Sequence, residues 1–214
     1  KTFKIKNNAK KNVLISLGQI YQYPVIHHGI YYIDTLKEWS NFLTELIQLL
    51  INKDIFVLIK PFCKASADVT VELIREWDRL FNDKIKIIQD YRKGKAIDYF
   101  DNVFATIWDS PTGGFVESLL TGKPAFSIAS NKLMEFQPES NIYINNLKKQ
   151  GLLNEKANIM ANNIELAMDN NKWWSNEKRK ESINSFLNKF IMTNEHWRHE
   201  WKDFFAKQLS SKID

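Results

Sequence analysis

The chain has 214 residues, 44% of them hydrophobic, which is enough for one globular core and excludes a short peptide or a disordered tail. Lysine and arginine number 30 against 25 aspartate and glutamate residues, so the net charge of +5 is mild, and the basic residues are spread along the chain. This excess suits an anionic ligand such as a nucleotide diphosphate, or an anionic membrane surface, without distinguishing between them.

Cysteine content and hydropathy limit the cellular setting. The single cysteine, Cys63, cannot form an internal disulfide or a multi-cysteine metal site. No apolar run reaches the ~18 residues that a membrane span requires. We therefore predict a cytoplasmic protein, with peripheral contact at the inner face of the membrane left open.

The N-terminal segment, residues 1–12, is dominated by lysine and asparagine and starts at Lys1 without a methionine. It carries no strand or helix signal. We interpret it as a linker or a truncated segment leading into the domain, and we expect an N-terminal domain of a larger protein to be missing.

Five short runs of β-branched or aromatic residues have the length of strands. They are VLISL (13–17), FVLIK (56–60), KIKII (84–88), VFATI (103–107) and PAFSI (124–128). Strands that alternate with helices form parallel βαβ units. Residues 13–130 therefore predict an α/β, Rossmann-like parallel sheet of about five to six strands with helices on both faces.

Two segments between these strands have helical periodicity. Residues 35–51 place six apolar side chains on one face: Leu36, Trp39, Leu43, Leu46, Ile47 and Leu50. Residues 69–81 do the same with Val69, Leu73, Trp77 and Leu80. Both faces are predicted to pack against the sheet.

After about residue 130 the sequence shows no further strand signal. Helices are predicted at 144–153, 156–170, 173–192 and 195–209, with a break at Asp169–Asn171. Residues 131–214 are thus interpreted as a helical C-terminal part of the same domain. Trp197 and Trp201, one turn apart in the last helix, are interpreted as packing anchors.

The most informative segment is IWDSPTGGFVESLLTGKPAFSI (107–128), in which a strand enters a turn and a helix starts at about Gly114. The helix N-terminus, the hydroxyls of Ser110 and Thr112, and the small residues Gly113 and Gly114 form a competent phosphate site.

Glu117 lies one turn into the same helix, where a carboxylate can accept hydrogen bonds from ribose hydroxyls. The alternative is structural: Ser110 or Thr112 merely caps the helix, and Glu117 is a solvated acid.

Two other strand ends supply candidates. Gly18 and Gln19 follow the first strand and could contact a diphosphate, and His27 or His28 could donate to it, although paired histidines in an aromatic loop are more often packing or surface residues. Lys60 ends the second strand and could neutralise phosphate, or simply meet solvent.

The segment from Ser110 to Pro124 resembles the donor-binding motif of GT-B glycosyltransferases and of the sugar-nucleotide epimerase that shares their fold. The matching residues are Ser110, Pro111, Thr112, Gly113, Gly114, Glu117, Leu120, Gly122, Lys123 and Pro124. Further on, residues 136–153, the pair Trp173–Trp174 and the ending WRHEWKDFF (197–205) are similar to bacterial transferases of surface-polysaccharide and lipopolysaccharide clusters. The resemblance spans roughly residues 13–205.

This resemblance implies one half of a GT-B fold, the half that binds the donor. It implies a nucleotide-activated sugar as substrate, a carbohydrate or lipid-linked acceptor, no metal or other cofactor, and a catalytic base from the missing N-terminal domain. The strand end Lys60–Pro61 is similar to the His-Pro strand end of transferases that use CMP-activated donors, but Phe62 stands where a histidine is expected.

Two alternatives stay open: a sugar-nucleotide epimerase of the same fold, and a non-catalytic interaction module whose aromatic C-terminal helices dock a partner. Neither a dinucleotide fingerprint, a P-loop, a zinc-binding H-E-x-x-H nor a nucleophile elbow is present. Acidic residues interrupt the basic C-terminal face, so nucleic acid is not predicted as a partner.

Overall fold

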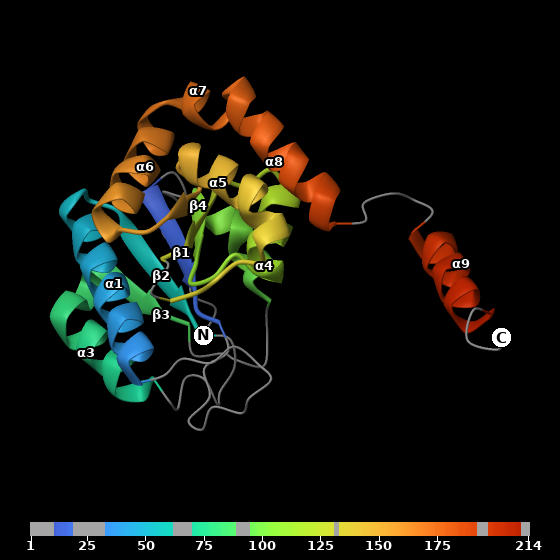
Figure 1. The fold of residues 1–214 in the computed structure, drawn as a ribbon. Helices are drawn as coiled ribbons and strands as arrows, with labels where there is room; N and C mark the ends of the chain where they lie inside the picture. Colours follow the sequence, from blue (N-terminus) through green and yellow to red (C-terminus); the bar gives the residue numbers. More distant parts are fainter. Residues whose placement is uncertain are drawn as a thin grey trace.

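The structure is a computed structural model that describes residues 11–18, 33–61, 70–88, 95–130, 133–191 and 197–210. Its centre is a six-stranded sheet, ordered β3-β2-β1-β4-β5-β6, in which every pair of neighbours is parallel (Figure 1). The strands are β1 (Asn12–Ser16), β2 (Phe56–Lys60), β3 (Ile85–Ile87), β4 (Ala105–Trp108), β5 (Ala125–Ile128) and β6 (Leu153–Asn154). The predicted α/β, Rossmann-like fold is confirmed.

The sixth strand corrects the prediction that no strand follows residue 130. The helix predicted at 144–153 is α5 (Asn141–Lys149) and ends before Gly151, whose φ of +75° lets the chain turn away from the helix. Leu153 and Asn154 then pair with Ser127 and Ile128 of β5. A two-residue strand has no detectable periodicity, and the leucines fit the helical pattern before them.

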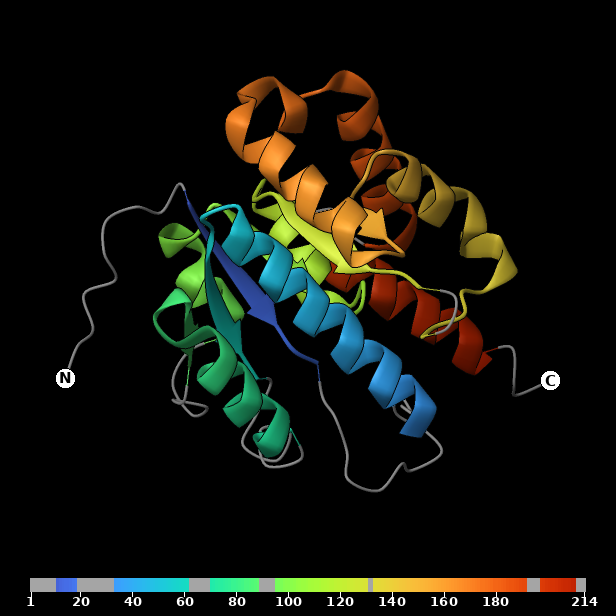
Figure 2. The ribbon, with the colours of Figure 1, turned by 90° about the vertical axis from the view of Figure 1, so that its left-hand side faces the viewer.

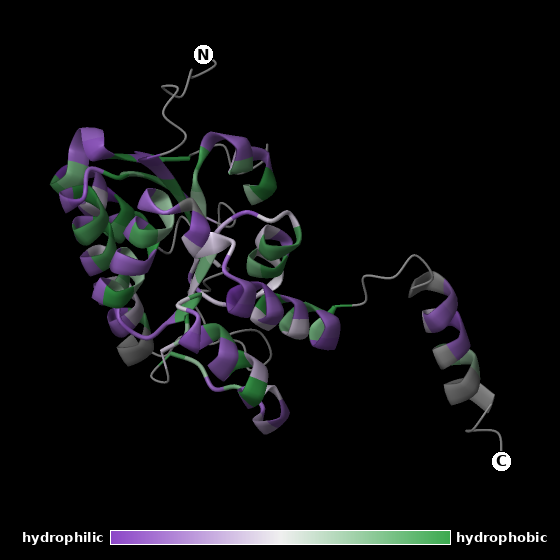
Figure 3. Ribbon diagram, turned by 90° about the horizontal axis from the view of Figure 1, so that it is seen from above, coloured by the Kyte–Doolittle hydropathy of each residue, from purple (hydrophilic) through white to green (hydrophobic). Residues whose placement is uncertain are grey.

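Helices cover both faces of the sheet (Figure 2). One face packs against α1 (Ile33–Asn52), α3 (Val71–Phe81) and α6 (Ala157–Asp169), and the other against the 3-10 helix η3 (Ala96–Asn102), α4 (Gly113–Leu120), α5 and α8 (Glu177–Phe190). Strand residues alternate between the two cores, so that Val13 and Ile15 face α1 while Leu14 faces α4. Figure 3 shows this layering, with mostly green, hydrophobic strands inside helices that carry purple, hydrophilic residues.

The predicted apolar face of α1 is confirmed, because five of its six residues are fully buried and Leu36 is partly buried. The prediction for α3 holds for Trp77 and Leu73 but is wrong for Leu80, which is 50% exposed. Phe81 is buried in its place, since the helix ends there and turns into the 3-10 helix η2 (Asn82–Lys84). Val69 lies outside the described residues.

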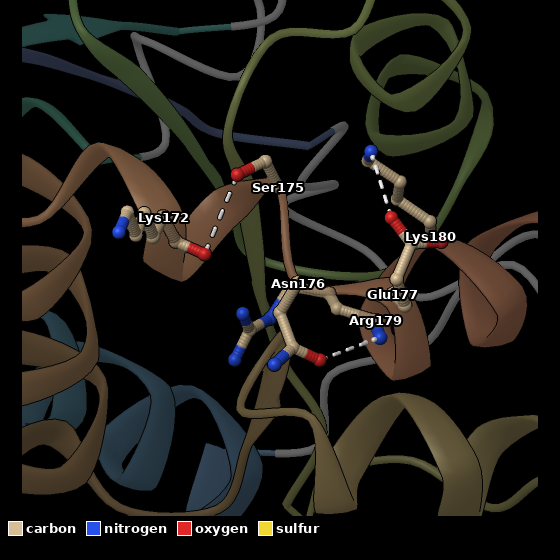
Figure 4. Close-up of polar contacts among 6 residues, drawn as sticks. All are labelled: Lys172, Ser175, Asn176, Glu177, Arg179 and Lys180. Carbon is tan, nitrogen blue, oxygen red and sulfur yellow. Dashed lines mark hydrogen bonds and ion pairs between the residues drawn. The ribbon is translucent and has the colours of Figure 1, made fainter.

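The break predicted at Asp169–Asn171 is confirmed, since α6 ends at Asp169 and the Asn170 side chain caps α7 (Asn171–Trp174). The single helix predicted at 173–192 is instead two helices. Asn176 interrupts it and accepts a hydrogen bond from the Arg179 backbone N–H at the start of α8 (Figure 4). A side-chain acceptor at this position competes with the helical hydrogen bond and so starts a new helix.

Arg179 holds this corner together. Its guanidinium, 3.4 Å from the centre of the Trp173 ring, donates to the carbonyls of Gln150 (3.1 Å) and Trp173. The indole of Trp174 donates to the Gly122 carbonyl at 3.1 Å. The tryptophan pair that carries part of the family resemblance therefore joins α7 to the turn before β5.

The last helix, α9 (Trp197–Ser210), lies apart from the sheet and its covering helices (Figure 1). Trp201 is 43% exposed, and its ring stacks on Phe205 of the same helix with 5.3 Å between ring centres. The interpretation of Trp197 and Trp201 as packing anchors stays a prediction. Among the described helices, which also include η4 (Pro138–Ser140), none is long and apolar enough to cross a bilayer.

Candidate ligand site between β1 and β4

The sheet reverses its direction of growth between β1 and β4. From β1 the chain adds β2 and β3 on one side, and it then returns to add β4, β5 and β6 on the other. The segments after β1 and β4 diverge, and such a switch point is where parallel sheets of this class bind ligands. Ser16 and Trp108, the last residues of the two strands, are paired in register. The predicted candidate Gly18 is therefore brought to the turn that carries Ser110, Thr112 and Gly113.

Asp109 joins the two strand ends, and it is not among the site residues predicted from the sequence. Its carboxylate accepts a hydrogen bond from the Gly18 backbone N–H at 2.6 Å, and a Cβ on Gly18 would lie 3.0 Å from the nearer carboxylate oxygen. Gly18 is thus fixed by a close approach to Asp109, and its N–H is already engaged. The signal in the sequence was an acidic residue placed between a buried strand and a glycine-rich turn.

Asp109 is only 2% exposed. Burial raises the pKa of its carboxyl to about 6, while the Gly18 N–H, the Trp39 side chain and the Ser110 hydroxyl act in the opposite direction. The Ser110 hydroxyl lies 3.5 Å from a carboxylate oxygen. Ser110 is therefore turned toward Asp109 and does not cap α4 through its side chain.

The inner side of α4 is anchored on β4. A Cβ on Gly114 would lie 2.0 Å from the Trp108 ring, so only glycine allows the helix to approach this closely. Beneath it, the Ser118 hydroxyl accepts from the indole of Trp108 (3.1 Å) and from Thr106 (2.9 Å), and it donates to the Gly114 carbonyl (3.0 Å). Gly114 is thus required for packing, which is a role separate from the predicted contact with phosphate.

The outer side of α4 is open. Thr112 occupies the N-cap position with an extended backbone, is exposed, and makes no capping hydrogen bond through its side chain. No described atom lies within 4 Å of a Cβ built on Gly113. The first backbone bond into the helix runs from Val116 to the Thr112 carbonyl, so the preceding N–H groups face the helix end. Glu117 stands exposed on this side.

A cavity of about 350 Å³ adjoins the turn. Pro111, Thr112, Gly113 and Val116 form its wall on the α4 side, and Ser140 is its other polar residue. The remaining walls come from η4, α5, α8 and the segments beside them, and they are apolar: Phe136, Ile144, Phe186, Phe190 and Ile191. Glu117 is not among the lining residues. The open end of α4 thus adjoins a largely apolar hollow.

Lys60, the other predicted site residue that the structure describes, is not brought to this turn. Lys60 ends β2, and because β1 lies between β2 and β4, it stands two strand spacings, about 10 Å, from Trp108. Its side chain is 6% exposed and lies 3.5 Å from the Pro61 carbonyl, so the alternative of a solvated lysine is wrong. Gln19, His27 and His28, like Phe62 and Cys63, lie outside the described residues. Among those described, no group of three His, Cys, Asp or Glu side chains is arranged to hold a metal ion.

The comparison with protein families places the chain among transferases. The model of the LIC12162 family transferase matches residues 61–205, a range that includes Asp109, the turn, α4 and the cavity but not Gly18. No curated protein matches the chain. Because the family match covers more than half of the 214 residues, the chain belongs to the LIC12162 family of transferases.

Proposed function

We propose that this transferase moves a sugar from a nucleotide-activated donor to a surface-polysaccharide or lipopolysaccharide acceptor, and that the chain is the donor-binding half of a GT-B enzyme. The observation that carries the proposal is the open N-terminal end of α4 at the switch between β1 and β4. The resemblance of the Ser110–Pro124 motif and the transferase family support it.

The diphosphate would rest on the turn. The first N–H groups of a helix have no acceptor in their own helix, and together with the helix dipole they favour an anion. Gly113 leaves room for phosphate oxygens, and Thr112 has a hydroxyl that is not used for capping. The Gly18 N–H already donates to Asp109 and is not free to bind phosphate. Gly18 would instead allow the diphosphate to approach the backbone closely, because it has no side chain.

The nucleoside would lie beside this turn. Its ribose hydroxyls would donate to the Glu117 carboxylate, which stands exposed one turn into α4. Its base would enter the cavity, where Phe136, Phe186 and Phe190 offer apolar surface to a flat ring. The cavity volume of about 350 Å³ lies within the roughly 300–1,000 Å³ typical of small-molecule sites.

The transfer step needs a stabilised leaving group. The acceptor oxygen forms a bond to the anomeric carbon while the bond from that carbon to the phosphate oxygen breaks, and the electron pair of that bond leaves on the nucleotide. Backbone N–H groups at the end of α4 would stabilise this charge, as preorganised donors do. The proton of the acceptor hydroxyl would pass to a base supplied by another domain.

The test is a calorimetric titration with UDP, GDP, CDP, CMP and ADP. We expect selective binding of one nucleotide by the wild type. Glu117→Ala removes the proposed ribose contact and should raise Kd about tenfold or more, which corresponds to about 1.4 kcal/mol. Glu45→Ala, which removes an exposed acid on α1, is the matched control and should leave Kd unchanged.

Either of two results would overturn the donor site. One is the absence of binding by all five nucleotides, and the other is an unchanged affinity in Glu117→Ala. Urea unfolding of both variants shows whether a loss of nucleotide affinity is caused by misfolding. We do not expect misfolding, because both side chains are exposed.

A further inference from the structure

A second hollow lies between side chains of α5 and α8, two helices that lie side by side in Figure 1 and also contribute walls of the cavity. It is an open surface depression of about 600 Å³, lined by Tyr143 of α5 and by Glu181, Asn184, Ser185, Asn188 and Lys189 of α8. We call this surface the polar groove. The α8 residues at 181, 184, 185 and 188 follow one face of the helix, since they are spaced by three and four residues.

Several residues of this face have a low helix propensity. Exposed helix positions are stabilised by good helix formers and by ion pairs between residues three or four apart. Asn184, Ser185 and Asn188 instead occupy the middle of α8 with amide and hydroxyl groups that favour turns and caps. Within the described part of the chain, none of their side chains makes a hydrogen bond. The stability of α8 is therefore not increased by these asparagine and serine side chains.

Their chemistry fits a polyhydroxylated ligand. An amide presents two donors and a carbonyl acceptor, and a serine hydroxyl both donates and accepts, which matches the alternating needs of sugar hydroxyls. Charge is confined to one acid and one base, Glu181 and Lys189. A strongly anionic ligand such as a nucleic acid or a lipid headgroup would instead select a basic surface.

Tyr143 adds an apolar surface. It is half-buried, and its ring packs edge-on against Phe190 with 5.4 Å between ring centres. Phe190 lines the cavity beside Thr112 and Gly113, so this aromatic pair joins the polar groove to the proposed donor site. An aromatic ring held in one orientation offers its face to the C–H groups of a sugar at a low entropic cost.

We propose that the polar groove binds a saccharide chain, and that this chain is the acceptor that extends toward the donor site. The saccharide binding rests on the groove alone. Its assignment to the acceptor rests on the proposed function.

The experiment uses 15N-labelled protein and hexasaccharides of glucose, galactose, mannose and N-acetylglucosamine as probes. We expect at least one of them to shift the side-chain amide signals of Asn184 and Asn188. The double variant Asn184→Ala/Asn188→Ala should raise its Kd at least tenfold. Alanine is the better helix former, so α8 should remain folded in this variant.

The matched control is Asn158→Ala/Asn162→Ala, which removes two exposed asparagines with the same spacing from α6 and should leave Kd within twofold of the wild type. The proposal is overturned if no hexasaccharide binds at about 10 mM, a concentration that detects affinities weaker than 1 mM. It is also overturned if the α8 double variant binds as tightly as the wild type.

Nucleotide titrations separate this proposal from the donor site. The α8 double variant should keep the nucleotide affinity of the wild type, and Glu117→Ala should keep the saccharide affinity. Saccharide binding in a protein that binds no nucleotide would uphold the polar groove while the donor site failed. The opposite pattern would overturn the polar groove alone.

Discussion

The two sides of α4 are built from similar residues and are used differently. On the inner side, Gly114 and Ser118 lock the helix onto Trp108. On the outer side, Thr112 and Gly113 make no comparable contact: the Thr112 side chain forms no capping bond, and a Cβ on Gly113 would meet no described atom within 4 Å.

Gly113 and Gly114 are therefore glycines for two different reasons. In a motif, both glycines suggest a close approach of backbone to ligand. In the structure, one glycine is needed because a tryptophan ring occupies the space of its Cβ, and the other leaves that space open. The inner side fixes where the helix N-terminus points, and the outer side is available to a ligand.

The largest effect is expected from Gly114→Ala. The added methyl group overlaps the Trp108 ring, and overpacking of this kind costs roughly 1–3 kcal/mol, with this contact at the upper end. Gly113→Ala adds the same methyl group to open space and should leave the free energy of unfolding unchanged or slightly higher, because alanine favours helix. Urea unfolding of both variants gives the comparison, and equal stabilities would refute the division between the two sides.

Asp109→Asn tests the contact between the Asp109 carboxyl and Gly18, which joins the ends of β1 and β4. The folded protein keeps the Asp109 proton up to about pH 6, whereas the unfolded chain loses it near 3.8. The folded state therefore binds more protons between these pH values, and its stability falls as pH rises through this window. At roughly 1.4 kcal/mol for each tenfold change in proton affinity, the fall amounts to about 3 kcal/mol at most.

Asparagine keeps an acceptor for the Gly18 N–H but carries no charge. We expect the stability of Asp109→Asn, relative to the wild type, to increase between pH 4 and pH 7. Thermal unfolding at a series of pH values measures this difference. A difference that does not change with pH would show that Asp109 titrates like an exposed acid.

The smallest effect is expected from Thr112→Val, which removes a hydroxyl without a large change of shape. Because this hydroxyl makes no capping bond, the free energy of unfolding should change by less than about 0.5 kcal/mol. Loss of one hydrogen bond to phosphate should weaken nucleotide binding roughly three- to tenfold. Calorimetry of this variant beside Ser118→Ala, which lies on the buried side, sharpens the comparison, because Ser118→Ala should lose stability and keep affinity.

The sequence by itself determined the parallel α/β class, because five apolar strands separated by amphipathic segments leave few other ways to bury both faces. It also determined the turn after β4, since a glycine-rich strand-to-helix turn has a local signature from Ser110 to Glu117. Local sequence patterns are sufficient to predict strands, helices and this turn, because their conformations depend mainly on residues that are close together in the chain. They were not sufficient for β6, whose two residues have no period of their own.

Only the tertiary structure decided which residues meet. The contact of Asp109 with Gly18 spans 91 positions in the chain, the collision that demands Gly114 is with a ring on the strand beneath it, and the burial of Lys60 depends on the chain that surrounds it. The pKa of Asp109 follows from this burial. Distances between remote residues depend on how the helices close over the sheet, and no local pattern of residues encodes them.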